Sequence, residues 1–247
     1  MTKLYGLIGN PLSHSFSKEY FENKFDKENL IGCIYNLYEI KEVELVLEVI
    51  KQNPSLLGLN ITIPYKETII PLLDSLDESA LGIGAVNVIK IIENKLIGFN
   101  SDYYGFEKSL LKWLPDELSG LNALILGSGG AAKAVKAVLI KNNIGYTTVS
   151  RKSSMNSITY LDLKESNLIG ENKLLINTTP VGMSPKINEF PDLAYNQLTS
   201  SHFAYDLIYN PSKSRFLKKA YAQGAHIKNG LEMLELQAEK SWEIWSS

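Results

Sequence analysis

The sequence is poor in the residues that build disulfides and metal sites. It contains one cysteine, Cys33, and three histidines, His14, His202 and His226, with no close spacing among them. A disulfide framework within the chain is therefore excluded, which fits a reducing compartment. Structural zinc sites need cysteine and histidine at short spacings, so we expect no metal ion.

Long apolar runs and an excess of charge of one sign are also missing. No apolar run reaches the ~18 residues expected of a membrane span, and the segment MTKLYGLIGN lacks the features of a secretory signal peptide. The formal net charge of -2 gives no reason to expect a nucleic-acid or membrane partner. We therefore expect a cytoplasmic protein in which local groups attract any anionic substrate.

The pattern that is present alternates strands and helices in two series. The length of 247 residues is comfortable for two domains. In the first series, the pattern predicts strands at 3–9, 33–40 and 56–64, helices at 17–29 and 43–53, a helical region at 65–76, and two strands around a turn at 93–95. In the second, it predicts strands at 122–127, 146–151, 173–180 and 203–209, helices at 131–143, 163–169, 214–224 and 231–245, and long loops at 155–167 and 183–193. This alternation is typical of an α/β fold with a mostly parallel sheet and a hairpin at one edge.

A glycine turn opens the second series. The segment GSGGAA, 127–132, fits G-x-G-x-x-A, follows an apolar strand and precedes an alanine-rich helix. In such a turn the glycines allow a tight bend and close approach to a pyrophosphate, which then faces the amides at the helix N-terminus. The alternative is a plain strand–helix turn whose small residues serve packing. The context favours a dinucleotide site.

The next strand indicates which dinucleotide binds. An NAD-binding fold carries an acidic residue ~20 positions on, whereas a basic residue there accommodates the 2′-phosphate of NADP. No carboxylate lies between Gly127 and Arg151, and Ser150, Arg151, Lys152 and Ser153 follow one another. Serine hydroxyls and a guanidinium can bind a phosphate. A solvated basic loop is the alternative, but the position favours NADP.

Polar residues that suit proton transfer follow the strands of the first series. Hydride transfer to or from an alcohol needs a proton partner, and Lys66 and Asp102 lie just beyond the segments NITIP and IGFN. Ligands bind at such strand ends. Taken alone, Lys66 reads as a surface lysine and Asp102 as the N-cap of the following helix. Ser17, in HSFS, reads as a helix N-cap by the same reasoning.

Nine segments, in order and over nearly the whole chain, resemble the shikimate dehydrogenase family. They are GNPLSHSFS, LNITIPYK, GAVNVI, GFNSDYYGF, LGSGGAAKAV, SRKS, INTTPVGM, DLIYNPSKSRFL and NGLEMLELQAEKSWEIW. The resemblance implies an N-terminal α/β substrate domain, residues 1–101, to which the terminal helix 230–247 returns, and a Rossmann-like NADP-binding domain, residues 102–229. The sequence departs from the family's usual pattern at Lys18, where proline is usual, and at Ser150-Arg151-Lys152, where Asn-Arg-Thr is common.

The resemblance also implies roles for individual residues. Lys66 and Asp102 would be the catalytic pair. The substrate would be bound by Ser15, Ser17, Asn60, Thr62, Asn87, Tyr209 and Gln237, the two serines holding its carboxylate. The cofactor would be bound by Gly127, Gly129, Gly130, Ala131, Ser150, Arg151, Ser153, Thr178, Leu207, Gly230 and Met233.

The activity implied is the reversible NADPH-dependent reduction of 3-dehydroshikimate to shikimate, in aromatic amino acid (chorismate) biosynthesis. A relative that prefers quinate, often with NAD, is the nearest alternative, although two serines in HSFS and the Arg151 segment favour shikimate and NADP. A non-catalytic protein that binds shikimate or NADPH would be expected to lack Lys66 or Asp102. A methylene-folate dehydrogenase would leave HSFS and Gln237 unexplained. The sequence leaves monomer and homodimer open.

Overall fold

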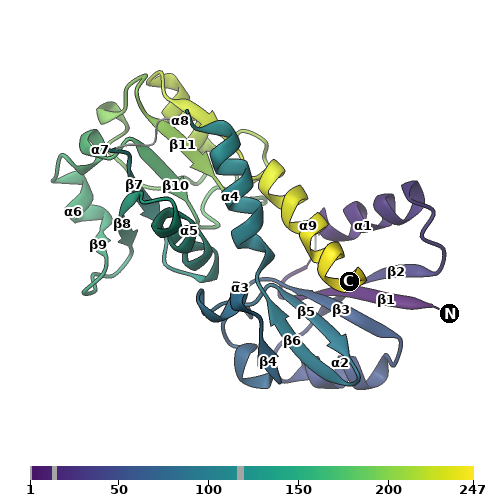
Figure 1. Ribbon diagram of the computed structural model, residues 1–247. Helices are drawn as coiled ribbons and strands as arrows, with labels where there is room; N and C mark the ends of the chain where they lie inside the picture. The colour runs from purple at the N-terminus through teal and green to yellow at the C-terminus, as the bar shows by residue number, and fades with distance from the viewer. Residues whose placement is uncertain (1, 13–15, 116–119) are drawn as a thin grey trace. The chain divides into compact units, whose positions relative to one another are not determined.

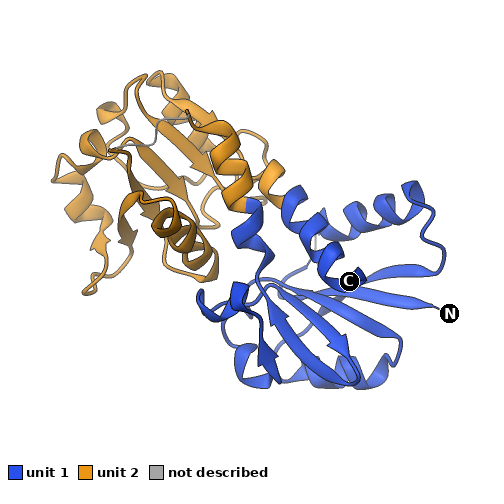
Figure 2. Cartoon of the chain, viewed as in Figure 1, with its two compact units in different colours: residues 1–105, 235–247 blue, residues 106–234 orange. Residues whose placement is uncertain are grey.

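The computed structural model describes residues 2–12, 16–115 and 120–247. The chain divides into two compact units (Figure 2). Unit 1 comprises residues 1–105 and 235–247, and unit 2 comprises residues 106–234. Two helices, α4 (Ser101–Trp113) and α9 (Leu231–Ser246), continue from one unit into the other.

Unit 1 is built on a mixed sheet of six strands in the order β2-β1-β3-β5-β6-β4 (Figure 1). Its strands are β1 (Lys3–Gly9), β2 (Cys33–Glu39), β3 (Leu56–Ile61), β4 (Ser75–Leu76), β5 (Val88–Ile92) and β6 (Lys95–Phe99). Strands β1, β2 and β3 are parallel, and β5 and β6 form the expected antiparallel hairpin. Glu93 and Asn94 make its turn with φ of 50° and 63°, the left-handed pair that a two-residue hairpin requires.

Helices cover both faces of this sheet. Helix α1 (Phe16–Lys27) and the end of α9 pack on one face, through an aromatic cluster that includes Tyr5, Phe21 and Trp245. Helix α2 (Leu45–Gln52) buries Val46 on the other face, and the short helix α3 (Glu78–Leu81) follows β4. Both faces of the parallel strands are therefore buried, as an α/β fold requires.

Unit 2 contains six strands in the order β12-β11-β10-β7-β8-β9, and every neighbouring pair is parallel. The strands are β7 (Asn122–Leu126), β8 (Gly145–Ser150), β9 (Ile158–Thr159), β10 (Leu174–Asn177), β11 (Phe203–Asp206) and β12 (His226–Lys228). Numbered within the unit, the order is 3-2-1-4-5-6, that of the Rossmann fold. The strand order reverses between β7 and β10, and a crevice at such a point binds the dinucleotide.

The helices of unit 2 also pack on both faces of the sheet. They are α5 (Gly130–Lys141), α6 (Tyr160–Lys164), α7 (Leu168–Glu171) and α8 (Arg215–Ala222). Leu163, Ile169 and Phe216 of α6, α7 and α8 join the core cluster around Ala204 of β11. The next residue of that strand, Tyr205, points to the opposite face and meets Phe106 of α4 edge-on. The α/β fold class with a Rossmann-like second half is confirmed.

Two sequence expectations were wrong in detail. Residues 65–76 form a 3₁₀ turn (Ile70–Leu72) and the short strand β4 instead of a helical region. Pro71 has no backbone N–H to donate to the hydrogen bonds of an α-helix. The Asp74 carboxylate accepts a hydrogen bond from the Leu96 backbone N–H, and the following strand β4 pairs with β6. The expected loop 155–167 contains β9 and α6, which a capping box between Thr159 and Asp162 begins.

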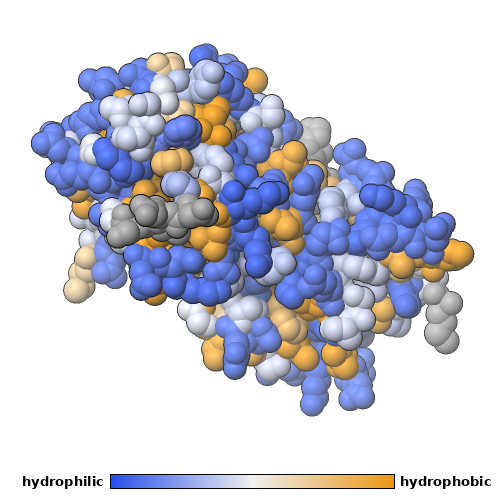
Figure 3. Space-filling model, turned by 45° about the horizontal axis from the view of Figure 1, so that its top comes forward, coloured by the Kyte–Doolittle hydropathy of each residue, from blue (hydrophilic) through white to orange (hydrophobic). Residues whose placement is uncertain are grey.

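Among the residues that the structure describes, no helix is long and apolar enough to span a membrane. On the face drawn in Figure 3, apolar side chains lie in small groups among hydrophilic ones. Exposed apolar residues such as Ile31, Leu81 and Ile140 come from separate elements. Isolated apolar residues of this kind are ordinary on protein surfaces and do not indicate a docking surface.

Candidate active site and cofactor site

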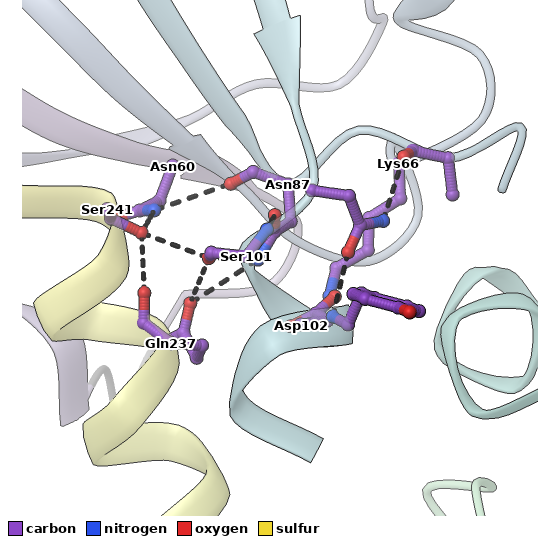
Figure 4. Close-up of polar contacts among 10 residues, drawn as sticks. Asn60, Lys66, Asn87, Ser101, Asp102, Gln237 and Ser241 are labelled. Atoms are coloured by element: carbon purple, nitrogen blue, oxygen red, sulfur yellow. Dashed lines mark hydrogen bonds and ion pairs between the residues drawn. The ribbon is translucent and has the colours of Figure 1, made fainter. Parts of the chain in front are cut away.

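A lysine–carboxylate pair lies at the edge of the unit 1 sheet (Figure 4). Lys66 lies in the turn after β3, and Asp102 is the second residue of α4. Lys66 Nζ donates a hydrogen bond to Asp102 Oδ2 at 2.6 Å. The side chains are only 17% and 9% exposed, so solvent screens their attraction weakly. An ammonium carries three protons, so Lys66 can contact a second acceptor while it holds Asp102.

Asp102 does not cap α4, contrary to the simplest sequence interpretation. The helix begins one residue earlier, at Ser101. Asn100 takes the capping role, because its Oδ1 accepts from the Tyr103 backbone N–H at 3.1 Å. The Asp102 carboxylate is therefore available to Lys66.

Three buried amides form a second part of the site (Figure 4). Asn60 is the last residue but one of β3, Asn87 precedes β5, and Gln237 lies on α9; each is at most 7% exposed. Gln237 Oε1 accepts from Asn87 Nδ2 at 3.3 Å, and Asn60 Nδ2 donates to the Asn87 carbonyl oxygen at 3.3 Å. Asn87 and Gln237 are 150 residues apart in the sequence, and α9 brings Gln237 next to Asn87.

Two serines that no sequence motif indicated connect these amides. Ser101 Oγ contacts Asn87 Nδ2 at 3.0 Å and Gln237 Oε1 at 3.2 Å. Ser241 Oγ accepts from Asn60 Nδ2 at 3.0 Å and lies 3.1 Å from Ser101 Oγ. Ser101 stands between Asn100 and Asp102, and Ser241 lies one helical turn after Gln237. These spacings were the only signals available in the sequence.

Ser17 reaches the same region through a tyrosine. Ser17 lies within the first turn of α1, which begins at Phe16, and its hydroxyl is hydrogen-bonded to Tyr35. Tyr35 in turn donates to Asn60 Oδ1 at 2.8 Å. Complete burial raises the pKa of Tyr35 far above its usual value, so the phenol stays protonated as a donor. Thr62 lies just after β3, next to Gly9; Ser15 lies outside the described residues.

The glycine turn of unit 2 is tight and leaves open space at the start of α5. Gly127 has φ of +114°, and a Cβ there would lie 2.6 Å from Thr178 Oγ1, so only glycine fits. Gly129 is the N-cap of α5, and a Cβ there would meet nothing within 4 Å. Gly130 and Ala131 are the first two residues of α5. The open space at Gly129, beside the helix N-terminus, fits the phosphates of a dinucleotide.

The proposed 2′-phosphate residues lie at the end of β8 and directly after it. Ser150 ends this strand, and its hydroxyl contacts Ser157 Oγ at 3.2 Å. Arg151 and Ser153 are exposed, so their polar groups are open to a ligand. The segment thus lies at the carboxyl end of the strand next to the glycine turn.

The remaining predicted residues of unit 2 lie after β10, after β11 and at the start of α9. Thr178 Oγ1 donates to the Leu126 carbonyl oxygen at 2.7 Å, which links its loop to the glycine turn. Leu207 and Gly230 are in direct backbone contact, since a Cβ at Gly230 would lie 2.0 Å from the Leu207 carbonyl oxygen. Met233 is 7% exposed, and Tyr209 lies in the loop after β11.

The described residues contain no group of three or more His, Cys, Asp or Glu side chains that could hold a metal ion. The polar groups of the site are instead one ammonium, one carboxylate, and a set of amides and hydroxyls. Such a set binds a hydroxylated molecule and can move a proton.

Comparison with known proteins identifies the family. Residues 7–89 match the family model of the shikimate dehydrogenase substrate binding domain. A shikimate dehydrogenase (NADP(+)) from Methanosphaera stadtmanae is 36% identical, covering 99% of this chain and 92% of the relative. The crystal structure of shikimate dehydrogenase 1 from Peptoclostridium difficile superimposes with a TM-score of 0.86 at 35% identity, covering 99% and 92% of the two chains. A solved shikimate dehydrogenase in complex with NADP+ gives 0.85 at 32% identity, covering 99% and 90%. The chain belongs to the NADP-dependent shikimate dehydrogenase family, oxidoreductases that act on a CH–OH group.

Proposed function

We propose that Lys66 and Asp102 are the catalytic pair of the shikimate dehydrogenase reaction, the reversible NADPH-dependent reduction of 3-dehydroshikimate to shikimate. The observation that carries this proposal is the hydrogen bond of 2.6 Å between Lys66 Nζ and Asp102 Oδ2 in a mostly buried setting. The family places the reaction in aromatic amino acid biosynthesis.

The two groups would act together on the oxygen that gains or loses a proton. Bound NADPH supplies the hydride for the ketone carbon. Lys66 would donate a hydrogen bond to the ketone oxygen, stabilise the charge that develops there, and pass on a proton. Stabilisation of this kind in a dry site is worth on the order of 3 kcal/mol. Asp102 would hold the ammonium in place for this transfer.

The substrate would lie among the hydroxyls and amides around this pair. Ser15 and Ser17 would bind its carboxylate, and Thr62, Asn87, Asp102 and Gln237 its ring hydroxyls. Asn60 already makes three hydrogen bonds within unit 1, so a ring hydroxyl would have to exchange with one of them. Tyr209 would also bind the substrate. In this proposal unit 1 is the substrate domain.

The cofactor would lie along the carboxyl ends of β7, β8, β10 and β11 in unit 2. Gly127, Gly129, Gly130 and Ala131 would face the pyrophosphate, and Ser150, Arg151 and Ser153 the 2′-phosphate. Thr178, Leu207, Gly230 and Met233 would line the nicotinamide end. The open space at Gly129 and the contact of Thr178 with the glycine turn support this arrangement.

A cytoplasmic location belongs to the same proposal, because a chain with a single cysteine suits a reducing compartment.

The test is a comparison of four rates. Shikimate or quinate is offered with NADP+ or NAD+, and the absorbance of the reduced nicotinamide is followed. We expect turnover mainly with shikimate and NADP+. Preference for quinate or NAD+ would overturn the specificity argument and leave the catalytic pair in place. No turnover in any pairing from folded protein would favour a binding protein over an enzyme.

A further inference from the structure

A carboxylate that forms no ion pair with any described residue is buried at the carboxyl edge of the unit 2 sheet. Asp206 is the last residue of β11 and is 0% exposed. Its Oδ1 accepts from Asn177 Nδ2 at 3.0 Å and from the Ile208 backbone N–H at 3.1 Å. Its Oδ2 accepts from the Ser214 hydroxyl. Three neutral donors therefore satisfy the carboxylate.

These donors come from three separate segments. Asn177 ends β10, and its own Oδ1 accepts from Thr179 N at 3.1 Å and from Thr179 Oγ1 at 2.7 Å. The chain of contacts thus orders the loop that carries Thr178. Ile208 follows Leu207 in the loop after β11. Asp206 joins the two loops that hold proposed nicotinamide residues.

The third segment is the start of α8. Ser214 is the N-cap of this helix, because its Oγ accepts from the Leu217 backbone N–H at 3.3 Å. Asn177 and Ser214, like Asp206, are 0% exposed. One carboxylate therefore fixes the ends of two strands and the beginning of a helix.

Burial of the ionised Asp206 carboxylate lowers the stability of the fold. Burial raises the pKa of Asp206 to about 6, against the hydrogen bonds that lower it. Among the described titratable groups, Tyr195 of the 3₁₀ turn Tyr195–Gln197 interacts with it electrostatically, and the Lys219 ammonium lies 5.3 Å from the Tyr195 ring. Neither is hydrogen-bonded to the carboxylate. A buried charge without an opposite charge beside it normally destabilises a fold. Its presence in this protein therefore points to a functional role.

We propose that Asp206 is a positioning residue for NADP: its carboxylate, bonded to Asn177, Ile208 and Ser214, holds the loops after β10 and β11 in the arrangement that the nicotinamide end of the cofactor needs. This inference rests on the proposed cofactor roles of Thr178 and Leu207. It assigns no contact between Asp206 and the cofactor.

The test replaces the carboxylate with an amide of the same shape. Asp206→Asn leaves one acceptor oxygen in place of two and turns a second donor toward Ser214 or Asn177. We expect the Kd for NADP+ to rise roughly tenfold, which corresponds to about 1.4 kcal/mol of binding free energy, because the two loops are less well ordered. The KM for shikimate should stay within about twofold. NADP+ binding is measured by calorimetry on the full chain.

The matched control is Asn172→Ala. Asn172 is another buried polar residue of unit 2, with Nδ2 bonded to the Leu168 carbonyl oxygen at 2.7 Å, but it precedes β10 and so lies at the opposite edge of the same sheet. It should lower stability without changing the Kd for NADP+ beyond about twofold. An equal loss of affinity in both variants, or none in Asp206→Asn, would overturn the proposal.

A pH series separates positioning from general destabilisation. The 2′-phosphate of NADP+ itself titrates near pH 6, but it does so identically with every variant. We therefore expect the ratio of the two Kd values, Asp206→Asn over the unsubstituted protein, to be largest above pH 7 and to shrink below pH 6, where Asp206 is protonated too. A constant ratio would contradict the proposal.

Two further variants keep the test decisive. If Asp206→Asn does not fold, Ser214→Ala removes one donor, and Ser214→Thr restores a hydroxyl that can cap α8. We expect Ser214→Ala to raise the Kd for NADP+ and Ser214→Thr to recover most of the loss; equal Kd values for the two would overturn the proposal. Thr178→Ala tests the site separately, since unchanged NADP+ binding in that variant would remove Thr178 from the proposed site whatever Asp206 does.

Discussion

Gly58 and Trp245 lie in direct contact, with the terminal helix pressed against the backbone of β3. A Cβ at Gly58 would lie 2.2 Å from Trp245 Nε1, and that indole nitrogen donates to the Ile89 carbonyl oxygen at 3.0 Å. Because Gly58 has no side chain, Trp245 can pack against β3. This contact fixes the position of α9, which carries Gln237 and Ser241.

This contact predicts the effect of Gly58→Ala. The added methyl group must displace the indole, and overpacking of this kind costs about 1–3 kcal/mol. Because α9 carries Gln237, we also expect the KM for shikimate to rise severalfold. Gly82→Ala is the control in the same unit, since its nearest neighbour would be 4.0 Å away. Urea unfolding and steady-state kinetics measure both effects, and equal behaviour of the two variants would refute the seating of α9 by Gly58.

The catalytic pair predicts a specific loss on removal of Lys66. We expect Lys66→Ala to lower kcat by roughly 10²–10⁴-fold, the range of general acid–base catalysis, with shikimate still bound. Lys24→Ala is the matched control, because Lys24 is also a buried lysine paired with carboxylates, Glu28 and Glu239, in the same unit. Turnover numbers of both variants decide the matter. A kcat unchanged in Lys66→Ala would exclude Lys66 from the reaction.

The segment after β8 predicts a change in cofactor preference. We expect Arg151→Ala to weaken NADP+ binding by roughly 10–100-fold, as for the loss of a charge-assisted hydrogen bond, and NAD+ binding much less. The sequence has one other arginine, Arg215, and Arg215→Ala serves as the control. Kd values for both cofactors measure the difference. Equal losses for NADP+ and NAD+ would show that Arg151 does not bind the 2′-phosphate.

Asp206 predicts a pH dependence of stability with a definite sign. Its pKa is about 6 in the folded protein and ~3.9 in an unfolded chain. The folded state therefore binds the proton more tightly, so the group favours folding below pH ~4, and this contribution is lost as the pH rises through about 6. Asp206→Asn cannot ionise and lacks this dependence. The unsubstituted protein should lose on the order of 3 kcal/mol relative to the variant between pH 4 and pH 7. Urea unfolding of both proteins at the two pH values gives this difference, and curves that stay parallel would contradict it.

Much of the fold follows from local sequence. The period-two and helical patterns located most strands and helices, and the glycine turn identified the Rossmann-like half. The hairpin at 93–95 was also found, because the polar segment Glu93-Asn94-Lys95 separates two apolar runs. The short strands β9 and β12 were missed, since two or three residues carry no detectable period.

The site was only partly accessible from the sequence. Lys66, Asp102 and the amides were singled out from strand ends and from the family resemblance. Asp102 taken alone pointed to an N-cap, and only the backbone geometry showed that Asn100 has this role. Ser101 and Ser241 were missed because nothing local distinguishes a serine that bridges amides from one that faces water.

By itself the sequence determined the α/β class, because periodicity and a glycine turn are local properties of the chain. The family and its preference for NADP followed from nine local segments that resemble shikimate dehydrogenases. Tertiary structure decided which polar groups meet. Gln237 reaches Asn87 across 150 residues, and Asp206 collects donors from three segments. Hydrogen bonds between distant residues depend on how strands and helices pack, and packing is a property of the whole fold.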